Sequence, residues 1–117
     1  MKKEDVIEYA LSLPNVYEDY PFGGSTTVLR HSGNKKSFIL LIHAHGRLYV
    51  NMKCEPLRAD ALRQTYAGVI PGYHMNKEHW NSVFLEEDVP EEVICHMIDV
   101  SYELTRPKIR IKKNGGG

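Results

Sequence analysis

Apolar positions recur with two different periods along the chain, which separates helical from extended segments. Val6 and Ala10 lie one helical turn apart, and residues 93–102 repeat this spacing. Asp88 is the expected N-cap of the last helix, because Glu91 follows three residues later. The pattern predicts strands at residues 26–31, 37–42, 47–52 and 80–85, and helices that end at Pro14, extend from Pro56 to Gly68, and extend from Asp88 to Pro107.

The order of these segments predicts the fold class. Short connections between the first three strands are typical of an antiparallel sheet. The order α-βββ-α-β-α therefore predicts an α+β domain, a two-layer sandwich in which helices cover an antiparallel sheet. Residues 14–25 and 69–77 are rich in turn formers and are expected to be loops. The 117 residues are predicted to form one domain at 1–107, followed by a flexible basic and glycine-rich tail at 108–117.

Composition narrows the class of protein. Hydrophobic residues make up 42% of the chain and charged residues 26%, as in an ordinary globular domain. The longest apolar stretch, residues 38–42, is far shorter than the ~20 residues of a membrane-spanning helix. Glu4 and Asp5 stand where a signal peptide would become apolar, and the two cysteines, Cys54 and Cys95, form no CxxC pair. We expect a cytoplasmic monomer with no membrane partner.

Charge is balanced in total but not in its distribution. The chain has 15 basic and 15 acidic residues, whereas a dedicated nucleic-acid coat protein has a basic excess that neutralises phosphates. Residues 86–103 contain seven acids and no Lys or Arg, and residues 106–113 contain five bases and no acid. This asymmetry is compatible with a local basic patch.

No motif in the chain predicts catalysis or a metal site. His43 and His45 lie two apart, which places them on one face of a strand, and His74 and His79 flank a polar loop. Their spacing matches neither HExxH nor a paired CxxC. Cys54 follows a lysine, which favours a lower thiol pKa, but no nucleophile elbow or phosphate-binding loop accompanies it. We expect no catalytic residue, no metal site and no cofactor.

Residues 71–81 form an irregular stretch that is unusually rich in aromatic, amide, imidazole and ammonium groups. One interpretation is a binding surface, in which Tyr73 or Trp80 stacks on a base and the polar groups contact phosphates. The other is structural, with Tyr73 and Trp80 as core anchors and Asn76 holding the loop through hydrogen bonds. The sequence leaves both interpretations open.

Several short motifs together resemble a known family. They are Pro21-Phe22-Gly23, Lys53-Cys54 with Pro56, Leu62-Arg63, Tyr73-His74-Met75-Asn76-Lys77 with His79-Trp80, and Ser101-Tyr102 with Leu104. The chain resembles the MmcQ/YjbR family from the first helix to about residue 106, and HMNK-x-HW is the most specific of these motifs. The resemblance implies a small bacterial protein with a CyaY-like (frataxin-like) α+β fold, in agreement with the predicted element order.

The resemblance also implies a function. Members of the family are described as DNA-binding, so we expect a non-enzymatic DNA-binding protein. The matching positions, taken as nucleic-acid-binding residues, are Lys53, Arg63, His74, Asn76, Lys77, His79 and Trp80. The alternative is a small-molecule or metal-binding protein, or an enzyme, with a pocket at residues 73–80. A concave site would favour the alternative, and a convex basic face would favour DNA binding.

Overall fold

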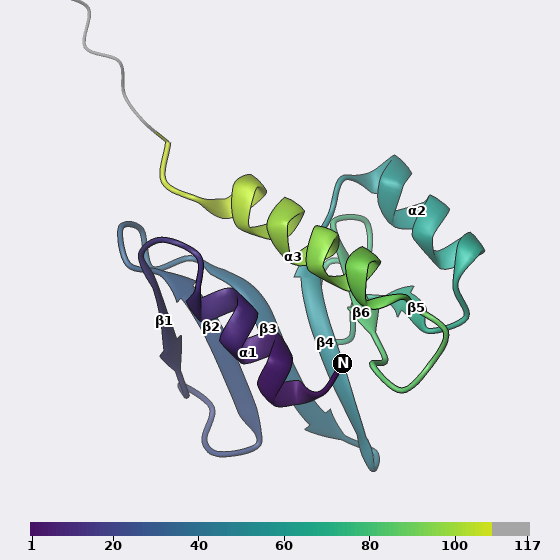
Figure 1. Ribbon diagram of the computed structural model, residues 1–117, viewed down its shortest axis with the longest axis horizontal. Coiled ribbons are helices and arrows are strands. Elements are labelled where there is room, and N and C mark those ends of the chain that lie inside the picture. Colours follow the sequence, from purple (N-terminus) through teal and green to yellow (C-terminus); the bar gives the residue numbers. More distant parts are fainter. Residues whose placement is uncertain (109–117) are drawn as a thin grey trace, which may run out of the picture.

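The computed structural model describes residues 1–108 and confirms the α+β class (Figure 1). Its elements are α1 (Lys3–Leu11), β1 (Val16–Asp19), β2 (Thr26–His31), β3 (Ser37–Ala44), β4 (Arg47–Lys53), α2 (Pro56–Thr65), β5 (Val69–Pro71), β6 (Trp80–Val83) and α3 (Glu91–Thr105). The strands form one antiparallel sheet in the order β1-β2-β3-β4-β6-β5. Helices α1 and α3 lie over one face of this sheet, and α2 lies beside β5 (Figure 1).

Two strands lie where loops were predicted. β1 falls within residues 14–25 and β5 within residues 69–77, so the observed order is α-ββββ-α-ββ-α. β1 carries two acids and no strong strand signal, but it pairs with β2 over four positions, and Arg30 Nε lies 2.7 Å from Asp19 Oδ2. β5 is ended by Pro71 and pairs with β6. Tertiary pairing overrides weak local propensity in both cases.

The helix boundaries correct three further predictions. α3 begins at Glu91 with Pro90 at its N-cap, so Asp88 is not the cap. The Asp88 carboxylate instead accepts hydrogen bonds from the N–H groups of Ala67 (3.0 Å) and Gly68 (2.8 Å), which lowers its pKa. α2 ends at Thr65 rather than at Gly68, and α1 ends at Leu11, before Pro14.

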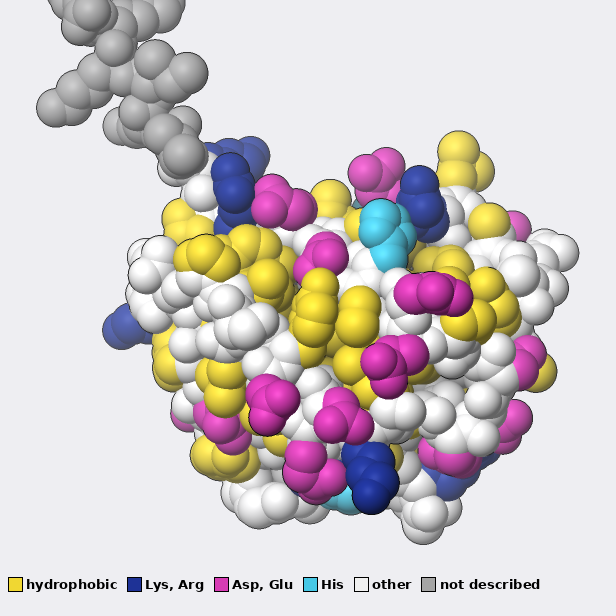
Figure 2. Space-filling view, viewed as in Figure 1, with side chains coloured by type: hydrophobic (Ala, Val, Ile, Leu, Met, Phe, Trp, Pro, Cys, Tyr) yellow, Lys and Arg dark blue, Asp and Glu magenta, His cyan; other side chains and the backbone are white. Residues whose placement is uncertain are grey.

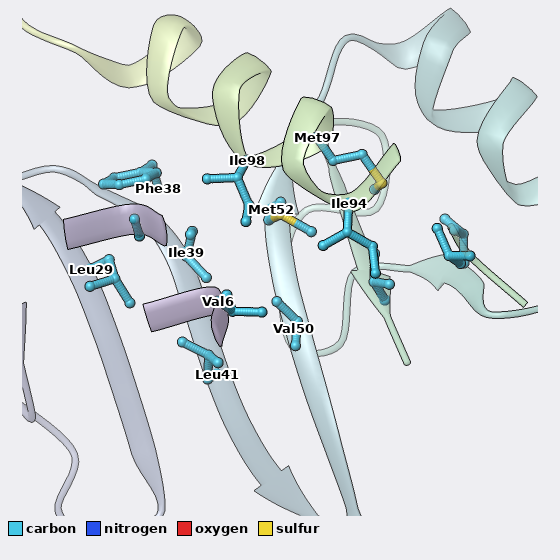
Figure 3. Close-up of a cluster of buried hydrophobic side chains, with 14 residues drawn as sticks. Val6, Leu29, Phe38, Ile39, Leu41, Val50, Met52, Ile94, Met97 and Ile98 are labelled. Atoms are coloured by element: carbon cyan, nitrogen blue, oxygen red, sulfur yellow. The ribbon is translucent and has the colours of Figure 1, made fainter. Parts of the chain in front are cut away.

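The hydrophobic core lies between the sheet and the two helices that cover it (Figure 3). Its fully buried side chains come from α1 (Val6, Ala10), α3 (Ile94, Ile98) and the strands (Leu29, Phe38, Ile39, Leu41, Val50, Met52, Val83). Each of these side chains that is larger than alanine stabilises the fold by about 1.5–3 kcal/mol relative to an exposed position. The arrangement is the predicted two-layer sandwich, and the specific likeness to CyaY stays a prediction.

Ser101 joins α3 to the sheet through its hydroxyl group. The side chain is fully buried and lies where the β3–β4 ladder ends at the pair Ile39 and Met52. Its Oγ accepts a hydrogen bond from the backbone N–H of Lys53 (2.8 Å) and donates one to the carbonyl oxygen of Phe38 (2.6 Å). One hydroxyl therefore satisfies a backbone donor and a backbone acceptor on neighbouring strands.

The structure describes nothing beyond residue 108. No helix within residues 1–108 is long and apolar enough to span a bilayer. The predicted tail lies almost entirely outside the described residues, so the division into a 1–107 domain and a 108–117 tail stays a prediction.

Candidate functional site

The polar loop at residues 72–79 connects β5 to β6 and is fixed to the sheet face that α1 and α3 leave uncovered. Two buried side chains of this face, Asn51 on β4 and Ser82 on β6, hold the backbone of Tyr73. Ser82 Oγ accepts the Tyr73 N–H at 2.8 Å, and Asn51 Nδ2 donates to the Tyr73 carbonyl at 2.8 Å. Ser82 also donates to Asn51 Oδ1, which closes the network. Both backbone polar groups of Tyr73 are thus satisfied by side chains of the sheet.

The interior of the loop is held by its own polar side chains. Asn76 Oδ1 accepts the N–H groups of Glu78 (2.9 Å) and His79 (3.2 Å), an Asx-type turn. Lys77 Nζ donates to the Gly72 carbonyl at 2.8 Å. The structural interpretation of Asn76 is therefore confirmed.

Arg63 ties the loop to α2. Its Nε donates to Asn81 Oδ1 at 2.7 Å, and its Nη2 donates to the carbonyl oxygen of Lys77 and, at 3.4 Å, to that of Trp80. Asn81 is fully buried and donates in turn to the carbonyl of Ala59 at 3.2 Å. The guanidinium group therefore connects α2, β6 and the loop, and it is half-buried rather than free.

A chain of aromatic rings covers the sheet face next to the loop. Tyr73 stacks on Tyr49 with ring centroids 4.2 Å apart, and Tyr49 meets the edge of Phe84 at 5.1 Å. The guanidinium of Arg47 lies 3.5 Å above the Phe84 ring, a cation–π contact. The exposed His74 ring packs on the other side of this row of rings, against Tyr73 and away from Phe84. These rings stabilise the uncovered face of the sheet.

The seven predicted site residues lie in one region but in three separate groups. Arg63, Asn76 and Lys77 hold the loop together. Lys53 lies opposite the half-buried Trp80 in the β4–β6 ladder, and the exposed His79 accepts the Cys54 N–H through its carbonyl at 2.8 Å. His74 lies apart from both groups, against the aromatic rings.

Sequence reasoning found only one part of a basic end of the molecule, which consists of Lys35, Lys36, Arg106 and Lys108. All four side chains are exposed. The turn between β2 and β3 meets the end of α3 there, because Asn34 Nδ2 donates to the Thr105 carbonyl at 2.9 Å and Gly33 lies against Pro107. Figure 2 shows Lys and Arg side chains in dark blue beside the point where the described chain ends. The base run after residue 105 was the available signal, but the turn lysines lie about seventy positions earlier.

The reactive residues considered in the sequence lie in unfavourable surroundings for catalysis or metal binding. Cys54 is buried, and desolvation raises the pKa of its thiol, contrary to the expected effect of a neighbouring lysine. Within residues 1–108, no three His, Cys, Asp or Glu side chains are placed to hold a metal ion. Residues 1–108 also form five surface hollows, and none of the five is lined by a residue of the loop at 73–80, where the alternative hypothesis placed a pocket.

These features define the protein as a small α+β domain, whose helix-covered antiparallel sheet carries a hydrogen-bonded polar loop on its other face. The chain belongs to the YjbR family, whose model matches residues 11–104. It is 34% identical to the Bacillus subtilis protein YyaQ, over 91% of this chain and 99% of the relative, and 37% identical to Escherichia coli O157:H7 YbdF, over 81% and 76%. These names state no activity.

Solved structures agree with this assignment. A crystal structure of a Pseudomonas syringae protein superposes with a TM-score of 0.81 at 31% identity, and it covers 91% of this chain and 100% of that protein. A crystal structure of Deinococcus radiodurans protein DR2400, which carries a DUF419 domain, gives a TM-score of 0.77 at 31% identity, over 86% and 75% of the two chains. The family and the fold are therefore established by sequence and by structure.

Proposed function

We propose that the protein is a non-enzymatic DNA-binding protein that contacts the phosphates of duplex DNA through its basic end. The observation that carries this proposal is the meeting of two distant basic segments, Lys35-Lys36 and Arg106–Lys108, on one exposed end of the fold. Exposed clusters of Lys and Arg supply the phosphate contacts of sequence-independent binding. The sequence after Lys108 contains three further positive charges, those of Arg110, Lys112 and Lys113.

The uneven charge distribution supports this proposal although the net charge of the chain is zero. Acidic side chains lie on α1 (Glu4, Asp5, Glu8) and on α3 (Glu91, Glu92, Asp99), the face shown in Figure 2. This face repels DNA, so the approach is directed to the basic end. Glu103 lies 3.4 Å from Arg106, but both groups are exposed, and an exposed ion pair of this kind costs little to exchange for a phosphate contact.

The loop at residues 72–79 has a supporting part in this proposal. Lys77 and Arg63 are engaged in hydrogen bonds to loop carbonyls, so a phosphate would have to replace those contacts. The basic end needs no such rearrangement. We therefore expect Lys35 and Lys36 to contribute more to DNA affinity than Lys77 does.

The test is fluorescence anisotropy of a labelled duplex, measured between ~50 and ~200 mM salt, a range over which phosphate-driven affinity falls steeply. We compare the wild type with Lys35→Ala/Lys36→Ala and with Lys2→Ala/Lys3→Ala. The second pair removes the same charge near the start of α1, away from the basic end (Figure 1).

If the basic end contacts phosphates, Lys35→Ala/Lys36→Ala should weaken DNA binding equally for all duplex sequences. It also predicts that the slope of log K against log salt becomes shallower by about 1.8, from ~0.9 for each lost phosphate contact. The α1 pair should leave the slope near that of the wild type. Absence of binding at ~50 mM salt would overturn DNA binding itself, and equal slopes for both double variants would overturn its assignment to the basic end.

A further inference from the structure

Helix α2 is attached to the fold by few contacts, which leaves a groove between it and α3. Of its ten residues, Ala59 alone is fully buried, while Leu57 is 90% exposed. The helix packs on β5 and is fixed mainly through the Arg63–Asn81 hydrogen bond and the Asn81–Ala59 hydrogen bond. Its side that faces α3 is therefore free to line a groove.

The groove has an inner and an outer part. The inner pocket has a volume of about 20 Å³, which is room for one water molecule. It opens into an outer groove of about 340 Å³, and both parts share Arg58, Leu62, Val93 and His96. This outer volume lies within the range of small-molecule sites. In Figure 2, a histidine and a basic side chain stand beside hydrophobic and acidic side chains in the region between α2 and α3.

The floor of the groove is apolar, and basic side chains line its inner end. Leu62 and Val93 line both parts, and Met97 and Val100 line the inner pocket. The basic side chains of Lys53, Arg58 and His96 line the same inner pocket, and no carboxylate lines it. The apolar floor and the basic inner end of the groove together match a ligand that is mostly apolar and carries one negative group.

The other titratable groups nearby do not cancel the positive charge of this inner end. Burial raises the pKa of the Cys54 thiol, so the inner pocket contains no thiolate at neutral pH. Glu92 lines the outer groove but not the inner pocket, and Glu55 is exposed next to Cys54. A bound anion would therefore be oriented with its charge toward the inner end.

We propose that the α2–α3 groove binds a small apolar carboxylate of the medium-chain fatty acid type. The carboxylate lies near Arg58, with Lys53 and His96 beside it, and the hydrocarbon chain lies along Leu62 and Val93 toward the outer groove. Hydrogen bonds from an ionised donor to a carboxylate are roughly twice as strong as neutral ones, so Arg58 fixes the polar end of the ligand. This site is separate from the basic end and does not depend on DNA binding.

The test uses decanoate below its micelle concentration, with the uncharged decanol as a matched ligand. Binding to the full chain is followed by amide chemical shifts in two-dimensional NMR, which identify the residues affected. Two variants probe the site: Arg58→Gln removes the charge at an exposed position, and Ala61→Trp fills the outer groove from an exposed position of α2. Arg106→Gln, at the opposite basic end, is the control.

Decanoate is expected to shift amides of α2 and α3 and to bind at least about tenfold more tightly than decanol, since one charge-assisted contact is worth about that factor. Arg58→Gln should remove most of this preference, Ala61→Trp should weaken both ligands, and Arg106→Gln should change neither. Equal affinity for decanoate and decanol would overturn the role of the basic inner end of the groove. Absence of shifts in α2 and α3 would overturn the site, and neither outcome bears on the salt-dependent DNA assay.

Discussion

Replacing Ser101 with Ala should destabilise the protein far more than the loss of one hydroxyl group suggests. The substitution leaves the part-buried Lys53 N–H and the buried Phe38 carbonyl without their partner, the fully buried Ser101 hydroxyl. An unsatisfied buried backbone group costs about 1–3 kcal/mol, and Ala gains back at most ~0.5 kcal/mol through its higher helix propensity. We expect a net loss of about 2–4 kcal/mol in the free energy of unfolding, and a Tm lower by roughly 6–15 °C.

Urea unfolding followed by circular dichroism measures this loss directly. Ser12→Ala is the matched control, because Ser12 Oγ also donates to a backbone carbonyl, that of Tyr9 at 2.6 Å, but in an exposed place. The control should change stability by less than about 0.5 kcal/mol. A loss below ~1 kcal/mol in Ser101→Ala, with an unchanged m-value, would show that the ends of β3 and β4 close on each other without the hydroxyl and would refute this reasoning.

Two further substitutions test the packing of the fold. Burial lowers the pKa of His31 below its usual 6.5, so the unfolded chain takes up the proton first. Stability should therefore be full above about pH 6.5 and fall as the pH decreases below that value, and His31→Gln should flatten this slope in pH-dependent urea unfolding. Gly72→Ala would place its Cβ 2.7 Å from Trp80 Cβ, which should cost about 1–3 kcal/mol in thermal unfolding, whereas Gly24→Ala, in open space, should not. An equal effect of the two glycine variants would contradict the close contact at Gly72.

The periodic segments of the chain could be predicted from sequence, because their apolar residues repeat with the spacing of the buried face. The three helices and the central strands were located in this way. β1 and β5 could not, because Glu18, Asp19 and Pro71 disfavour a strand locally and only pairing with β2 and β6 stabilises it. Asp88 was misassigned for a related reason: its partners, the N–H groups of Ala67 and Gly68, come from a distant segment rather than from the helix that follows.

The candidate sites show the same limit. The polar loop was found because its composition is unusual within one short stretch, whereas the structural part that Asn76 plays in it was one of two interpretations that the sequence left open. Nothing in the sequence indicated that Lys35 and Arg106 lie at the same end of the molecule, since only the packing of the β2–β3 turn on the end of α3 brings them together. The α2–α3 groove depends on how far α2 stands from α3, which no local pattern encodes.

The two outermost strands of the sheet have a consequence for the behaviour of the protein at high concentration. β1 has four residues and β5 has three, both shorter than the usual ~5–6 residues of a strand. Two copies that met along β1 would bring Glu18 and Asp19 of each chain together, and Pro71 on β5 has no N–H to offer. Both edges are thus poor templates for another chain, and the fold carries its own protection against growth into fibrous aggregates.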